Sequence, residues 1–555
     1  MYFPQLSTPR QSRVTVSRFL GLDRRPRGQE GSFREMENLC ADGYPTLTVR
    51  RPRGVAGSAV SPGGLTVKEG LIWLDGHTLY INGSAAGLAL SEGRKQLISM
   101  GAWLLIWPDK AYINTKDLTD FGSLENKRVT EGEVSFALCR PDGTVYSGYL
   151  AADEAPEEPE AGSLWLDTGG DETALRQYGQ DGWTAVDDVC VRMNAAGIGI
   201  GFTAGDGVAV SGCRETALNG SFPLRSVEDD YVVVTALPRS LSSQSDPVTV
   251  ERSVPDMDYV VESGNRLWGC KYGIVNGQAV NAIYASKLGD FKNWNCYAGL
   301  STDSYAASRG SDGAFTGAAD YLGNPLFFKE NCVERVYPSA SGAHQIVTVQ
   351  CAGVTSRSSG SLRVVDGKLY YHSQGGVCVF DGSMPVHVSQ ALGEMRYHNA
   401  VAGALDGSYY LSAADENGAW HLLVLDTRQG LWYREDGVEA VGFAPWGGDL
   451  YCLTAAGQLL AMKGSGENRE GPVQWLAETG ELGLDAPESR YLVRLSLRLL
   501  PEADSTVRAW VSYDEGGSWQ PAGSLEGAGR VQACTLHIRP RRCRQLRLRL
   551  TGRGG

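Results

Sequence analysis

The fold is decided by a short phrase that occurs three times in the second half of the chain, as Asp366-Gly367-Lys368-Leu369-Tyr370, Asp406-Gly407-Ser408-Tyr409-Tyr410 and Gly447-Gly448-Asp449-Leu450-Tyr451. The last tyrosines of the three phrases are 40 and 41 residues apart. Each phrase joins a tight glycine-containing turn to an aromatic strand, as a β-hairpin does. A repeat of this length is typical of a four-stranded propeller blade. The three phrases therefore predict a β-propeller.

The composition agrees with an all-β fold. The chain has 70 glycines and 23 prolines among 555 residues, and long apolar stretches with a 3.6-residue period are nearly absent. Turns are therefore frequent and helices scarce. One short helix is expected over residues 32–39, where Ser32 would cap the first turn and Glu35 would complete a capping box.

The pattern of turns, prolines and strands divides the chain into five parts. An extended N-terminal arm is predicted over residues 1–60, which carry five prolines. Propeller blades are predicted over 61–150 and 188–463, and a small Pro-rich, acidic β-hairpin module is inserted between them at 151–187. Residues 472–555 alternate apolar and polar side chains in longer strands, which favours a C-terminal β-sandwich.

Charge and cysteine spacing narrow the possible functions. A net charge of −13 and a pI near 5.2 argue against broad binding of nucleic acid. The 12 cysteines are spread singly, without a CxxC pair or a histidine at ligand spacing, so no metal site and no cofactor are predicted. Reduced thiols fit synthesis in a reducing cytoplasm. The N-terminus has no basic region followed by an apolar run, and no apolar run approaches the length of a membrane span. We therefore predict neither an export signal nor insertion into a membrane.

Catalytic motifs are not apparent in the sequence. Residues 512–519 match the Asp-box pattern Ser-x-Asp-x-Gly-x-Ser/Thr-Trp, but one copy outside the repeats is read as a structural turn. His372 and His398 lie beside aromatic residues and lack a spaced partner, which favours packing roles. Neither a G-x-S-x-G elbow nor a P-loop is found. The sequence therefore predicts no catalytic residue and a protein that is not an enzyme.

Several segments resemble a known group of proteins. Phe19-Leu20-Gly21-Leu22-Asp23, Gly31-Ser32-Phe33-Arg34-Glu35-Met36-Glu37-Asn38-Leu39 and Tyr44-Pro45-Thr46-Leu47-Thr48-Val49-Arg50 together resemble the opening arm of tailed-bacteriophage and prophage virion proteins. Residues 284–294 are similar to their S-x-x-G-D turn, and residues 351–354 with 370–377 to one of their blades. Residues 156–183 look like a hairpin common in phage tail proteins.

This resemblance implies a propeller subunit of the tail hub, the nozzle or the head-to-tail connector, which builds an oligomeric ring. The implied partners are further copies of the chain and other tail, portal or adaptor proteins, with DNA only as passing cargo. The implied location is the virion tail, after synthesis in the bacterial host cytoplasm. The candidate subunit contacts are Phe19, Leu22, Phe33, Met36, Leu39, Tyr44, Arg50 and Arg51.

Two other functions stay open at this point. In the first, the chain binds a glycan of the host surface, and Trp165, Tyr178 and Trp183 of the inserted module stack on sugar rings. In the second, it is a sialidase-like glycosidase, which requires arginines and acids gathered at the centre of the propeller.

Overall fold

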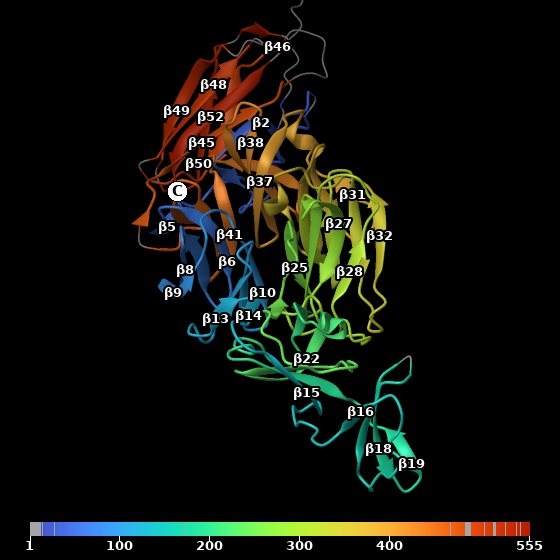
Figure 1. The fold of residues 1–555 in the computed structure, drawn as a ribbon. Coiled ribbons are helices and arrows are strands. Elements are labelled where there is room, and N and C mark those ends of the chain that lie inside the picture. The colour runs from blue at the N-terminus through green and yellow to red at the C-terminus, as the bar shows by residue number, and fades with distance from the viewer. Residues whose placement is uncertain are drawn as a thin grey trace, which may run out of the picture. The chain divides into compact units, whose positions relative to one another are not determined.

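The computed structural model describes residues 13–554 apart from 14, 27, 171, 467, 483–489, 504, 514–517, 528, 540 and 544–545. Within these residues the regular elements are β-strands and three short 3-10 helices, so the expected all-β fold is confirmed. No helix in the described part of the chain is long and apolar enough to span a membrane. The chain forms two compact units (Figure 1): the first holds residues 1–76 and 351–555, the second residues 77–350.

Three propeller blades of the first unit contain the three repeated phrases. The blades are β33–β36 (Arg363–Val365, Lys368–Ser373, Gly376–Phe380, Val386–His387), β37–β40 (Tyr397–Leu405, Ser408–Asp415, Trp420–Asp426, Leu431–Glu435) and β41–β43 (Ala440–Trp446, Asp449–Thr454, Gln458–Ala461) with β5 (Gly54–Ser58). Each phrase forms the turn between the first two strands of its blade. Both turn residues have a positive φ, for example 49° at Asp406 and 75° at Gly407. This backbone is that of a hairpin turn matched to twisted strands, and the predicted propeller is confirmed.

The third of these blades is completed by the N-terminal part of the chain. Strand β5 pairs antiparallel to β43, and β44 (Asn468–Arg469) pairs with β5 as well. Segments separated by some 400 residues in the sequence therefore share one sheet, and β5 leads directly to the hairpin β6–β7 (Pro62–Val67, Leu71–Asp75).

The C-terminal β-sandwich also takes strands from the N-terminal part. Its larger sheet has the order β1-β2-β45-β52-β48-β49, and its other pairs are β47–β50 and β46–β51. In the order of the larger sheet, the strands are β1 (Gly21–Leu22), β2 (Ser32–Glu37), β45 (Val473–Thr479), β52 (Arg547–Gly554), β48 (Thr506–Ser512) and β49 (Gln520–Glu526). The strands of the other pairs are β47 (Arg494–Leu499) with β50 (Gln532–His537), and β46 (Arg490–Tyr491) with β51 (Arg542–Cys543). The two layers meet where Leu536 packs against Gly523.

The expected helix over residues 32–39 is wrong. Residues 32–37 form β2, and β3 (Leu39–Cys40) pairs with β4 (Thr48–Val49). A β-bulge lies between Phe33 and Glu35, so Phe33 and Met36 both face the interior although they are three residues apart. That spacing imitates one face of a helix, which explains the error.

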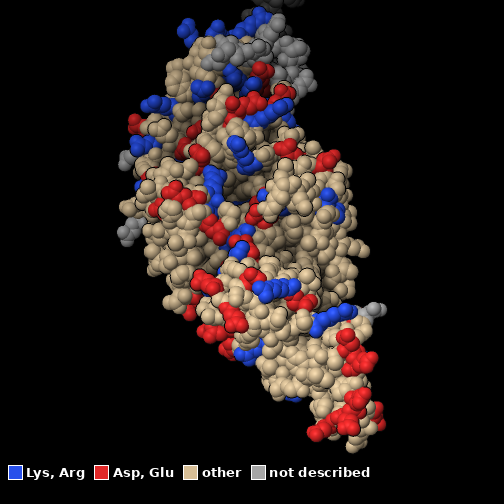
Figure 2. Space-filling model, in the orientation of Figure 1, with Lys and Arg blue, Asp and Glu red and all other residues tan. Residues whose placement is uncertain are grey.

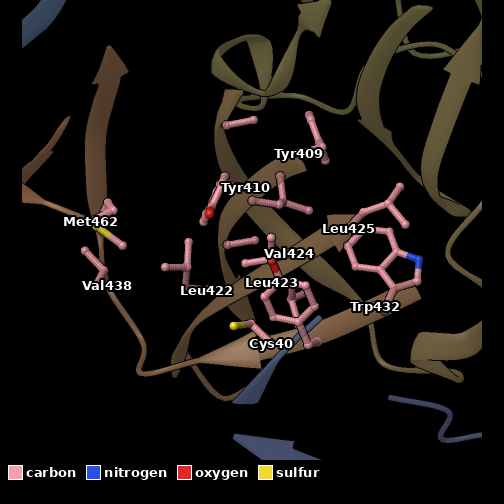
Figure 3. Packing of buried hydrophobic residues seen from close by; sticks show 14 of the residues in the cluster. Cys40, Tyr409, Tyr410, Leu422, Leu423, Val424, Leu425, Trp432, Val438 and Met462 are labelled. Atoms are coloured by element: carbon pink, nitrogen blue, oxygen red, sulfur yellow. The ribbon is translucent and has the colours of Figure 1, made fainter. Parts of the chain in front are cut away.

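The core of the first unit joins the propeller to the N-terminal segment. Figure 3 shows Cys40 packed among Tyr410, the run Leu422–Leu425 and Trp432. These side chains belong to blade β37–β40 and are almost fully buried. The N-terminal segment therefore supplies part of the core.

The second unit contains further blades of the same kind. They are β10–β13 (Gln96–Met100, Trp103–Trp107, Ala111–Asn114, Phe121–Ser123), β25–β28 (Tyr259–Ser263, Arg266–Val275, Gln278–Ala285, Tyr305–Ser308) and β29–β32 (Gly317–Tyr321, Asn324–Phe328, Cys332–Tyr337, Gln345–Gln350), with the hairpin β8–β9 (Thr78–Ile81, Ser84–Ala89). Gly264-Asn265 and Leu322-Gly323 repeat the turn with two positive φ angles.

A separate seven-stranded sheet occupies part of the second unit. Its order is β14-β24-β21-β22-β23-β20-β15, with bounds Asn126–Val129, Thr249–Arg252, Gly207–Ser211, Gly220–Glu228, Tyr231–Val234, Cys190–Asn194 and Ser135–Cys139. The domain boundaries predicted from the sequence assigned these strands to the propeller blades over 61–150 and 188–463. Alternating strands look alike in a blade and in any other antiparallel sheet, so the pattern did not separate them.

The inserted module follows β15 as a small four-stranded sheet. Its strands are β16–β19 (Leu150–Ala152, Leu164–Asp167, Ala174–Gly179, Gly182–Ala185), and β16 runs parallel to β17. The other two pairings are antiparallel. This sheet carries the three aromatic residues predicted to contact a glycan.

Candidate functional site

The structure places most of the predicted subunit contacts inside the first unit. Four of them are at most 6 % exposed and belong to its hydrophobic core, namely Leu22, Phe33, Met36 and Leu39. Phe19 is half-buried and stacks on Phe33, with 5.8 Å between ring centroids. Tyr44 is half-buried under the guanidinium of Arg18. Buried side chains have no surface to offer a neighbouring subunit, and of the eight residues only Arg51 is exposed.

Arg50, another predicted contact, forms ion pairs within its own unit. Its Nε donates to Asn38 Oδ1 at 2.8 Å, and its terminal nitrogens pair with Asp436 and Glu470. Burial raises the pKa of Asp436, but hydrogen bonds from Asn38 and Arg50 outweigh it and lower that pKa overall. Arg53 Nη2 lies 3.1 Å from Glu435 Oε2 in the same network. The arginines therefore fasten the N-terminal segment to blade β37–β40 and to residue 470.

A cavity of about 240 Å³ opens beside the same blade. Its walls are the turn between β34 and β35, the segment that follows β36, and His372 and Leu411. Gly375, Gly376 and Gly393 are among the residues of these walls. The lining carries one carboxylate, Glu394, together with amide, guanidinium and phenol groups. The cavity can therefore hold a polar molecule, while the pair of carboxylates that usually hydrolyses a glycosidic bond is not part of this lining.

His372, at the base of this cavity, is 2 % exposed. Burial, assisted by the nearby charge of His398, lowers the pKa of His372 to about 4, so the ring is neutral near pH 7. Its Nδ1 lies 2.8 Å from Thr355 Oγ1. The sequence reading left His372 without a partner because Thr355 is 17 residues away and no spacing rule connects the two.

Tyr397, on the cavity wall, connects the site to the N-terminal segment. Arg24 Nη1 donates to the hydroxyl of Tyr397 at 3.4 Å, and Arg24 Nη2 pairs with Glu35 Oε2 at 2.9 Å. The ring of Tyr397 also meets His421 edge-on at 5.8 Å. No motif in the sequence marked these residues, since they come from β2, β37, β39 and the segment before β2.

The three predicted glycan-contact residues lie together in the module. Trp183 contacts Trp165 and Tyr178, with ring centroids 5.4 and 5.2 Å apart. Trp165 is only 7 % exposed, and its indole nitrogen donates to the carbonyl of Ala152 at 2.9 Å. Trp183 and Tyr178 are half-buried. The cluster is therefore the core of the module, and two of its three rings reach the surface.

The module is also strongly acidic. Residues 151–188 hold eleven Asp and Glu and one Arg, a net charge of −10 out of −13 for the whole chain. Figure 2 shows these carboxylates gathered over the module. Most of the net negative charge of this protein therefore lies on the small module rather than on the propeller.

Comparisons with known proteins show structural likeness only. No protein-family model matches the chain, and no curated protein matches it. Among solved structures it is similar to the phage phi92 endosialidase (9 % identity, 89 % of this chain and 79 % of that chain, TM-score 0.25). It is also similar to PorZ, a surface component of the type-IX secretion system of Porphyromonas gingivalis (12 % identity, 90 % and 82 %, TM-score 0.26).

A further similar structure is an exo-β-1,3-galactanase from Phanerochaete chrysosporium (9 % identity, 53 % of this chain and 91 % of that chain, TM-score 0.22). The similar structures thus include a phage protein and enzymes that act on glycans. Identities and scores at this level concern the fold alone and point to no reaction and no residue of this chain.

These comparisons correct the expectation that the chain is not an enzyme. Glycoside hydrolases and an endosialidase are among the similar structures, so the lack of a short catalytic motif does not separate this chain from enzymes. The physical reason is that the side chains at the centre of a propeller come from different blades. No local sequence pattern has to mark them.

Proposed function

We propose that this chain is a structural subunit of the tail of a bacteriophage or prophage, of the hub, nozzle or head-to-tail connector type, and that it forms a homo-oligomeric ring. Its partners are further copies of itself and adjoining tail, portal or adaptor proteins, and DNA passes it as cargo. It resides in the virion after synthesis in the bacterial cytoplasm. The proposal rests first on the segments that resemble virion proteins.

The observation that carries the proposal is the course of the N-terminal segment. Its strand β2 belongs to the sandwich and its strand β5 to a propeller blade, and ion pairs of Arg50 and Arg53 fix the chain between them. One segment thus ties two β-domains of the first unit together. Such cross-connection suits a part of a virion, which must keep its shape under load.

The structure changes how subunits of such a ring would meet. The candidate subunit contacts of the predicted N-terminal arm would face a neighbouring subunit, but residues 21–58 supply strands β1–β5 to their own chain. The contacts between subunits must then come from other surfaces. Residues outside 151–188 carry a net charge of only −3, so the net charge of the chain gives no reason to expect an acidic lumen around the passing DNA.

The test is the mass of the full chain in solution, measured by light scattering over a concentration series, with negative-stain electron microscopy of each species. We expect a single mass several times 59.7 kDa and a ring in projection. A mass of 59.7 kDa at every concentration, alone and after mixing with purified portal or adaptor rings, would overturn the proposal. A deletion of residues 1–60 is unsuitable, because it removes β1 and β2 from the larger sheet of the sandwich and β5 from a propeller blade.

A second candidate function is binding of a glycan on the host surface. It is favoured by Trp183 and Tyr178, two adjoining aromatic rings that reach the surface of the module. The burial of Trp165 weakens the original form of this hypothesis, in which all three rings would stack on sugars. Glycan-array binding that is lost in Trp183→Ala and kept in the exposed control Gln177→Ala would support it. A glycan array without any signal for the wild type would rule out this second function.

A further inference from the structure

The larger sheet of the C-terminal sandwich presents a basic face on β52 and β48, with Trp519 just before β49. Residues paired across these antiparallel strands point to the same side, and the register pairs Arg549 with Trp510 and Arg508 with Thr551. We define the basic face as Arg508, Trp510, Trp519, Arg547, Arg549 and Arg553. Arg508 and Arg553 are exposed.

The centre of the basic face is held in place by one buried carboxylate. Glu478, 8 % exposed, accepts from Arg547 Nη1 at 3.2 Å and from Arg549 Nη2 at 2.7 Å. Arg549 also lies over the ring of Trp519, with 4.0 Å from its guanidinium carbon to the ring centroid. Two guanidinium groups thus share one carboxylate and stay fixed. Their orientation is set before any partner arrives, which lowers the cost of binding.

The basic face keeps an excess of positive charge. Its four arginines face Glu478 and Glu526, which is paired with Thr506 on the same side of the sheet. On β2, which pairs with β45, Glu35 and Glu37 are already paired with Arg24 and Arg434. Arg508 and Arg553 form no ion pair within the described residues. Their charges are therefore available to an acidic partner.

The same chain contains an acidic surface that fits this face. In the module, the exposed carboxylates without an ion pair among the described residues include Glu154, Glu157, Glu158, Glu160 and Asp181. Asp167, by contrast, pairs with Arg176 at 2.9 Å. Among the described residues, the exposed, unpaired Arg508 and Arg553 on one surface and the exposed, unpaired carboxylates on the other are complementary in charge.

We propose that the acidic module of one copy docks on the basic face of the next copy. Such a contact joins two different surfaces, so each copy uses one surface of each kind and the contacts can close into a ring. This inference rests on the proposed ring and names the surfaces that build it. The opposite charges of the two surfaces would also orient the subunits as they approach each other, because electrostatic attraction steers diffusional association.

The experiment is a charge swap in the full chain, read by light scattering in 50 mM and 500 mM NaCl. Four double variants isolate the two surfaces and their controls. They are Arg508→Glu with Arg553→Glu on the basic face, Glu157→Lys with Glu158→Lys on the module, and the exposed controls Arg494→Glu with Arg498→Glu and Glu131→Lys with Glu133→Lys. A fifth protein combines the basic-face and module changes. All these side chains are exposed, so the fold tolerates the changes, and circular dichroism confirms it.

We expect each surface variant to raise the apparent dissociation constant of the oligomer at least about tenfold at 50 mM NaCl, and the combined swap to restore it, while both controls behave as the wild type. The wild-type oligomer should also weaken in 500 mM NaCl, because salt screens exposed charges beyond about 5 Å. A wild-type oligomer that neither surface variant alters would overturn this inference and leave the ring standing. A wild type that is monomeric at both salt concentrations, alone and after mixing with purified portal or adaptor rings, would overturn both the ring and this inference.

Discussion

Protonation of the buried His372 should make the first unit sensitive to mild acid. In the folded protein its pKa lies near 4, because burial disfavours the charged ring, and its ordinary value is 6.5. The unfolded chain therefore takes up the proton first as the pH falls. Stability from the neutral ring is fully present above pH 6.5 and is lost between pH 6.5 and about 4, which amounts to about 3 kcal/mol.

The assay is chemical unfolding followed by tryptophan fluorescence at several pH values between 7.5 and 4. Carboxylates also titrate in this range, so the measured quantity is the difference between wild type and His372→Gln, whose amide can still bond to Thr355. The wild type should lose about 3 kcal/mol more than this variant. The exposed control His537→Gln should follow the wild type. Parallel pH profiles of wild type and His372→Gln would refute the reasoning.

Three further outcomes are expected. Met36→Ala should destabilise the first unit by about 2–5 kcal/mol in thermal or denaturant unfolding, because it empties a buried site, whereas Arg34→Ala on the same strand should cost less than about 0.5 kcal/mol. Gly367→Ala and Gly407→Ala should each cost about 1 kcal/mol through their φ of 78° and 75°, because the Arg428 side chain near Gly407 is 61 % exposed and can move away from the new Cβ. Cys139, whose pKa burial raises to about 12, should resist thiol reagents at pH 8 until the protein unfolds.

The propeller could be predicted because its turns carry their own chemistry. The phrases at 366, 406 and 447 place glycine at positions that need a positive φ, and this requirement is local. Leu322-Gly323 adopts the same turn, but leucine is not a residue that predicts a positive φ. The blade that holds this turn, β29–β32, also differs in length from the other blades. The regular period was therefore visible only in the second half of the chain.

The course of the N-terminal segment could not be predicted in the same way. Its residues were expected on an extended arm because turn signals and prolines are frequent in residues 1–60. Whether an arginine such as Arg50 faces solvent, a neighbour or its own chain depends on carboxylates some 400 residues away, Asp436 and Glu470. Pairing over such distances leaves no periodic signal in a single sequence.

In the inserted module the sequence predicted the position of three aromatic residues but not whether they pack in a core or bind a ligand. The sequence placed Trp165, Tyr178 and Trp183 on one small hairpin sheet, and the structure brings them into contact. A sheet this small has little core, so aromatic rings that pack with each other are needed for stability before they are available to a ligand. The ten excess negative charges of residues 151–188 disfavour packing against acidic surfaces and favour a basic one. The rings therefore hold the module together, and its charged exterior is the part that is free to recognise a partner.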